Sequence, residues 1–125
     1  MDQIAPGLLA WQWEGYARYH QSRANLLMHI VLVPVFLAGN VAVAVGFLRF
    51  DWIEALVGTG CMTISMALQG RGHQGEPVPP IPFSGAGNAL ARTFLEQWIT
   101  FPRFVLSGGW WAAFRRHGVG AQMRP

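Results

Sequence analysis

Three of the four histidines in the sequence have a spacing that favours a metal site. His20, His29 and His73 can each supply an imidazole, and Glu76 adds a carboxylate three residues after His73. Two or three imidazoles with a carboxylate bind zinc or non-haem iron, and they suit Fe(II) that keeps coordination positions open for oxygen. The alternative is that these histidines lie at a membrane boundary and bond backbone groups or lipid heads. The spacing matches no compact metal motif, so the metal interpretation depends on the elements that carry these residues.

A helical hairpin is predicted between His29 and His73. Residues 30–48 contain no charged side chain, and as a helix they span about 29 Å, close to the thickness of the hydrocarbon core of a bilayer. Residues 52–68 form a second apolar segment of about 26 Å, and only the short polar stretch 49–51 separates the two. We therefore expect an all-α integral membrane protein whose two transmembrane helices form an antiparallel hairpin.

This hairpin predicts where the histidines lie. Its turn centres near Phe50, and His29 lies 21 residues before that point while His73 lies 23 residues after it. Residues at equal distance from the turn of a hairpin face each other, so the two imidazoles are expected to meet at the membrane boundary. His20 lies nine residues before His29 and would point to the opposite face of one continuous helix. It can join the other two only if the chain breaks between them.

The break is predicted at residues 21–23, where Ser22 is a suitable N-cap for the first spanning helix. Asn25 precedes His29 by four residues, so it shares the same helix face and could orient that imidazole. Glu96 and Gln97, further along the chain, are interpreted either as an exposed polar face or as outer contacts to the site.

The flanking segments are expected to be interfacial. Residues 6–20 have the pattern of an amphipathic helix on the membrane surface, and residues 70–87, rich in glycine and proline, predict a loop. Residues 88–116 are predicted to form interfacial helices, with Pro102 as a kink or stop. His117 follows two arginines and is expected to be a solvated surface residue.

Composition supports the membrane class and a single domain of residues 1–125. Only 12% of the residues are charged and 52% are hydrophobic, whereas a typical soluble domain has about 25% charged residues. The net charge of +3 comes from arginines that form no stripe, which argues against a nucleic-acid partner. Most of these arginines precede or follow the hairpin, so the positive-inside rule predicts that both termini face the cytoplasm. The single cysteine, Cys61, cannot form an internal disulfide.

The motifs around the hairpin resemble a known family. The chain from about residue 10 to residue 82 resembles the Mpo-type 2-hydroxy fatty acid dioxygenases, a group of small membrane proteins, in a bacterial branch. The resemblance rests on the order and spacing of short motifs on both sides of the hairpin, which are Tyr19-His20, Asn25, His29 and Pro34 before it and Gln69, Gly72-His73 and Glu76 after it.

The resemblance implies an Fe(II)-dependent enzyme of the inner membrane that shortens a 2-hydroxy fatty acid by one carbon with O₂. It further implies that His20, His29 and His73 are the metal-binding histidines and that Glu76 and Asn25 serve in catalysis. The expected partners are a lipid or fatty acid, O₂ and the bilayer, and the oligomeric state is left open. Two alternatives stay open, namely a haem electron carrier ligated by His29 and His73 and a non-catalytic membrane adaptor.

Overall fold

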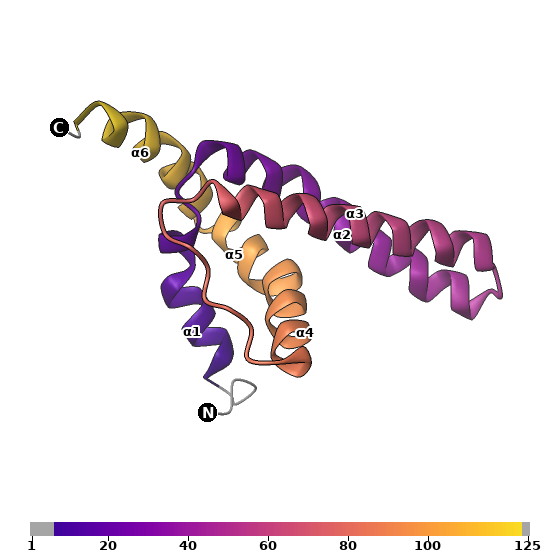
Figure 1. The fold of residues 1–125 in the computed structure, drawn as a ribbon. Helices are drawn as coiled ribbons and strands as arrows, with labels where there is room; N and C mark the ends of the chain where they lie inside the picture. Colours follow the sequence, from indigo (N-terminus) through magenta and orange to yellow (C-terminus); the bar gives the residue numbers. More distant parts are fainter. Residues whose placement is uncertain (1–6, 124–125) are drawn as a thin grey trace.

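The computed structural model describes residues 7–123, with side chains up to residue 116, and within these residues the chain is all-α with no strand. The long helices α2 and α3 lie side by side, and the shorter helices gather around the end of this pair that is distant from its turn (Figure 1). The elements in chain order are α1 (Leu8–Gly15), a 3₁₀ turn (Tyr16–Tyr19), α2 (Arg23–Leu48), α3 (Trp52–Gln74), α4 (Ala86–Leu95), a π-helix (Glu96–Thr100), α5 (Phe101–Leu106) and α6 (Gly109–Met123).

The predicted antiparallel hairpin is confirmed, and glycines bring its two helices into close contact. A Cβ atom at Gly39 would lie 2.7 Å from the carbonyl oxygen of Gly58, and a Cβ atom at Gly58 would lie 2.7 Å from the carbonyl oxygen of Gly39. Both helices therefore approach backbone to backbone, as small residues allow in membrane helices. The turn contains Phe50 in a left-handed conformation, with φ 54°. Asp51 then caps α3 by accepting a hydrogen bond of 3.1 Å from the backbone N–H of Glu54.

Among the described residues, α2 is the one helix that is long and apolar enough to cross a membrane. Only 22% of its most apolar stretch is buried within the chain. The sequence predicts two spanning helices, but α3 is less apolar, because residues such as Thr59 and Thr63 interrupt its hydrophobic surface. The hydroxyls of both threonines donate hydrogen bonds of 2.9 Å to carbonyl oxygens of their own helix.

A small aromatic and aliphatic core joins the shorter helices to the hairpin. It contains Tyr16, Leu26, Val33, Phe101 and Phe104, all less than 5% exposed. These residues come from the 3₁₀ turn, α2 and α5, so the core holds the N-terminal and C-terminal segments against the same end of the hairpin.

Several boundaries differ from those that the sequence predicts. The first helix ends at Gly15 and a 3₁₀ turn follows, so residues 8–19 are not one continuous amphipathic helix. Helix α3 continues to Gln74, which leaves a shorter loop of residues 75–85 before α4. Pro102 does not stop the helical segment that begins with α4. It lies in the first turn of α5, where a missing backbone N–H is tolerated. The side chain of His117 lies outside the described residues.

Candidate metal centre

The structure brings together three imidazoles and one carboxylate that could hold a metal ion. His20, His29, His73 and Glu96 each offer a ligand atom, and these atoms all lie within 4.8 Å of one another. The three imidazole rings meet edge to face, with centroid distances of 4.8 to 5.0 Å. The predicted meeting of His29 and His73 across the hairpin is thus confirmed, and His20 joins them.

His20 reaches the group because the chain breaks where the sequence predicts. His20 itself adopts φ −133° and ψ 65°, which ends the 3₁₀ turn. Ser22 then caps α2 with an extended backbone, and its hydroxyl accepts a hydrogen bond of 3.3 Å from the N–H of Asn25. The break turns His20 back toward His29, whereas one continuous helix would hold the two on opposite faces.

Backbone carbonyls fix the orientation of two imidazoles. Nδ1 of His20 lies 2.7 Å from the carbonyl oxygen of Tyr16, and Nδ1 of His29 lies 3.0 Å from that of Asn25. A carbonyl oxygen can only accept, so both Nδ1 atoms carry hydrogen and Nε2 is the ring atom that remains to bind a metal ion. Both Nε2 atoms are buried and have no hydrogen-bond partner, and neither does Nδ1 of His73. These are the free donor atoms that a metal ion requires.

The distances to Glu96 fit a shared metal ion better than direct hydrogen bonds. Oε2 of Glu96 lies 3.4 Å from Nε2 of His20 and 3.6 Å from Nε2 of His29. A charge-assisted N–H···O bond is about 2.7–2.9 Å long. Two ligands that each lie about 2.1 Å from one metal ion in tetrahedral arrangement are about 3.4 Å apart. Glu96 and the two histidines therefore have the separation of ligands around one ion.

The carboxyl group of Glu96 is ionised. Burial alone would raise the pKa of its carboxyl group, but the contacts with His20 and His29 hold this pKa well below its ordinary value. Burial and the neighbouring carboxylate raise the pKa of the Tyr16 hydroxyl, which stays protonated and donates a hydrogen bond of 2.7 Å to Oε2 of Glu96. Burial and the charges of His20 and His29 lower the pKa of His73 to about 4, so this imidazole is neutral at physiological pH.

A π-helix carries Glu96 into the group. It spans Glu96–Thr100, and Pro102 follows at the start of α5, where it can donate no backbone hydrogen bond. The next residue, Gln97, is fully buried and exchanges two amide hydrogen bonds, of 2.9 and 3.0 Å, with Gln69 on α3. This reciprocal pair anchors the π-helix to the hairpin next to the histidines.

Glu76 and Asn25, the predicted catalytic residues, lie outside the group of potential ligands. Glu76 is buried and accepts hydrogen bonds from the backbone N–H groups of Gln21 (2.8 Å) and Ser22 (3.0 Å) and from Nδ2 of Asn25 (2.8 Å). Its carboxylate ties the loop after α3 to the start of α2. Asn25 orients His29 through its backbone carbonyl, while its side chain binds Glu76. A direct part of these two residues in catalysis stays a prediction.

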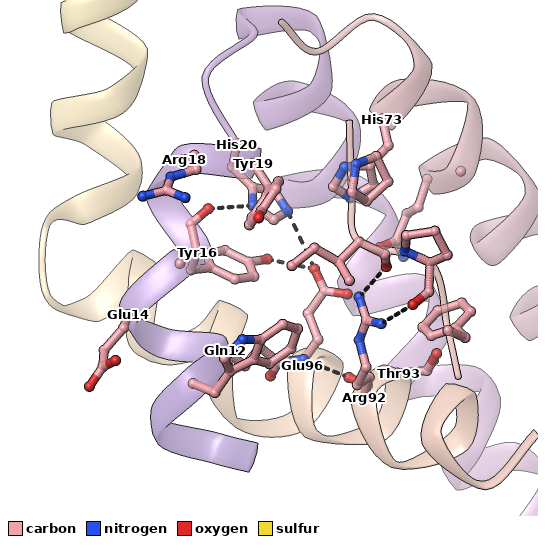
Figure 2. A pocket seen from close by; sticks show the side chains of 18 of the residues that line it. Gln12, Glu14, Tyr16, Arg18, Tyr19, His20, His73, Arg92, Thr93 and Glu96 are labelled. Carbon is pink, nitrogen blue, oxygen red and sulfur yellow. Dashed lines mark hydrogen bonds and ion pairs between the residues drawn. The ribbon is translucent and has the colours of Figure 1, made fainter. Parts of the chain in front are cut away.

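A pocket of about 570 Å³ opens beside the histidines. Tyr16, His20, His73 and Glu96 line it, and Figure 2 shows Glu96 between Tyr16 and Arg92. The sequence suggested Glu96 only as an outer contact to the site or as part of an exposed polar face, and it gave Tyr16 and Arg92 no place in the site. No known protein family matches the sequence, and neither a curated protein nor a solved structure matches it.

Proposed function

We propose that the protein is a membrane-embedded, Fe(II)-dependent dioxygenase that acts on a 2-hydroxy fatty acid, as the family resemblance implies. One observation carries the proposal. The Nε2 atoms of His20 and His29 are buried and unpartnered, and both face one oxygen of the ionised Glu96 carboxylate.

This arrangement favours a bound cation. Two buried Nε2 atoms and an ionised carboxylate oxygen lie together at distances longer than ordinary hydrogen bonds, and a metal ion bound between them would satisfy all three. Nitrogen and oxygen donors without a thiolate suit zinc or non-haem iron. Bound Fe(II) would supply oxygen activation, which an amino-acid side chain does not provide.

The chain itself supplies orientation and shielding. Tyr16 acts on two ligands, since its backbone carbonyl holds the ring of His20 and its hydroxyl holds Glu96. The adjoining pocket has the size of a ligand-binding cavity, and its wall includes apolar side chains. A substrate chain can lie along that wall while its polar head faces the histidines.

The hairpin supports a membrane location. Large apolar side chains are exposed along both helices and at the turn, where Leu48 is 80% and Ile53 77% exposed. Such a surface suits lipid better than water. We infer that the hairpin is inserted in the bilayer with the turn on the far side, and that the metal centre lies at the cytoplasmic boundary among the shorter helices.

The alternatives have less support. The rings of His29 and His73 contact each other with centroids 5.0 Å apart, which leaves no space for a porphyrin between them. A non-catalytic adaptor would not need to bury three imidazoles and a carboxylate, which costs free energy unless their charges are compensated.

The metal content of the detergent-purified protein tests the proposal. We expect the wild type to bind one iron ion per chain and to convert a long-chain 2-hydroxy fatty acid into the acid one carbon shorter, detected by mass spectrometry. Glu96→Gln and His73→Ala should lose both iron and product. Glu76→Gln should keep iron, and so should Glu14→Gln, which alters an exposed carboxylate on the pocket wall. Metal-free protein with full activity, or Glu96→Gln with full iron content, would contradict the proposal.

A further inference from the structure

The pocket beside the metal centre has an apolar wall and a polar end. Its polar end contains His20, His73, Gln69 and Glu96, which belong to the metal centre or its anchor. The apolar wall comes from α1, α3 and the loop before α4, and includes Trp11, Met66, Pro80, Ile81 and Phe83. Ile81 is 45% and Phe83 53% exposed, so the loop side of the wall is open. A pocket of this kind fits a molecule with one polar head and a long apolar chain.

Arg92 provides a positive charge at the junction of these two parts. It lies on α4 four residues before Glu96, so the two side chains share one face of the helical segment. Figure 2 shows its guanidinium pointing into the pocket beside Glu96. Nη2 donates a hydrogen bond of 2.8 Å to the carbonyl oxygen of Ile81 and Nη1 one of 3.2 Å to that of Pro82, which fix the guanidinium in place.

Within the described part of the chain no carboxylate forms a direct ion pair with Arg92, although the charge of the nearby Glu96 acts on it. The ion pairs found there join only histidines to Glu96, and the acceptors that Arg92 contacts are two carbonyl oxygens and the amide oxygen of Asn88. The rings of Phe83 and Trp11 lie 4.5 and 5.1 Å from its guanidinium carbon and shield it from water. A partly desolvated cation that has no direct ion pair attracts an anion more strongly than an exposed cation does.

Arg18 is the other arginine on the pocket wall, and water reaches its charge more freely than that of Arg92. It is exposed, and Figure 2 shows its guanidinium pointing away from Arg92. Exposed ion pairs contribute little because water screens them. Arg18 is therefore a matched control for Arg92.

We propose that Arg92 binds the carboxylate of a long-chain fatty acid in this pocket and makes the site select acids over neutral lipids of the same chain length. The inference rests on the proposed function, because it places the acid head beside the metal centre. It adds the residue that recognises the head and a selectivity that the metal ligands do not provide.

Binding measurements with an acid and an alcohol of equal length test this inference. The probes are 2-hydroxypalmitate and 1-hexadecanol, titrated at pH 8 into detergent-purified protein, once with saturating Zn(II), which does not react with oxygen, and once with a chelator. We expect Arg92→Gln to weaken binding of the acid by about 10–100-fold, the range for a hydrogen-bonded charge, and to leave binding of the alcohol within about threefold. Arg18→Gln should leave both affinities unchanged.

The alcohol distinguishes recognition from a purely structural role. If Arg92 only holds the loop carbonyls of Ile81 and Pro82, then Arg92→Gln weakens acid and alcohol equally, and the inference is overturned. An unchanged acid affinity overturns it as well. Arg92→Lys, which keeps the charge but loses the planar guanidinium, should recover part of the selectivity. A protein that binds no metal but still loses acid binding in Arg92→Gln would contradict the proposed iron chemistry and leave the pocket assignment standing.

Discussion

Gly72→Ala is expected to disturb the metal centre without altering any potential ligand. Gly72 lies on α3 directly before His73, and a Cβ atom there would overlap with Oδ1 of Asn25 and lie 3.1 Å from the sulfur of Met28. The backbone carbonyl of Asn25 orients His29 and its side chain binds Glu76. The added methyl group would therefore displace Asn25, which orients His29, and it would do so at the position directly before His73.

The expected magnitude follows from two opposing terms. Overpacking a well-packed site costs about 1–3 kcal/mol. Alanine gains about 0.5–1 kcal/mol over glycine in a helix, although less near the helix end. We expect a net loss of about 1–2 kcal/mol for Gly72→Ala. Gly70→Ala is the matched control, because nothing lies within 4 Å of a Cβ atom at Gly70 and only the helix term applies.

Thermal unfolding of the metal-free protein measures this difference. About 1 kcal/mol shifts the Tm of a domain of this size by about 4 °C, so Gly72→Ala should unfold about 4–8 °C below the wild type and Gly70→Ala at or above it. Because His29 and His73 shift together, Gly72→Ala should also bind metal more weakly, by isothermal titration with Zn(II). A Gly72→Ala protein as stable as Gly70→Ala would refute the close contact on which the reasoning depends.

Two further expectations concern the ligands and the hairpin. Tyr16→Phe removes the 2.7 Å hydrogen bond to Glu96 and should lower metal affinity about 10–100-fold in a Zn(II) titration. Tyr19→Phe, on the same pocket wall, is the control and should keep the wild-type affinity. Equal losses in the two variants would show that the Tyr16 hydroxyl has no specific part in metal binding. For the topology, Phe50→Cys in a background without the native cysteine should react with an impermeant maleimide on intact cells, and Ser107→Cys only after lysis. Labelling of both residues from the same side would exclude a spanning hairpin.

The hairpin and the histidine grouping could be predicted because they depend on simple geometry. An uncharged stretch, a short polar turn and a second apolar stretch define an antiparallel pair, and equal distance from the turn brings His29 opposite His73. The capping chemistry of Ser22 predicted the chain break that brings His20 to them, and the structure contains this cap. The sequence also predicted a second spanning helix, and the polar residues of α3 make that helix less apolar than α2.

The carboxylate could not be predicted in the same way. Proximity in sequence favoured Glu76, which follows His73 by three residues, but the end of α3 and the loop turn Glu76 toward the start of α2. Glu96 lies 76 residues after His20 and reaches the group through a π-helix, whose wider turn departs from the 3.6-residue period used to assign helix faces. Arg92 could not be assigned for a different reason, since its place beside the site depends on how α4 packs against α1 and the loop.

The four potential ligands come from four separate segments, and this has a consequence for the whole molecule. His20 directly follows the 3₁₀ turn, α2 carries His29, α3 carries His73 and the π-helix carries Glu96. The group therefore exists only when the hairpin and the shorter helices are assembled. A metal ion that binds this group must therefore stabilise the folded chain over the unfolded one. The far half of the hairpin contributes no ligand and extends from the body in Figure 1 with its apolar side chains exposed. An apolar surface of that extent would favour aggregation in water. Under the proposed function, insertion of this half of the hairpin into lipid would hold the candidate metal centre and its pocket at the boundary where a fatty acid leaves the bilayer.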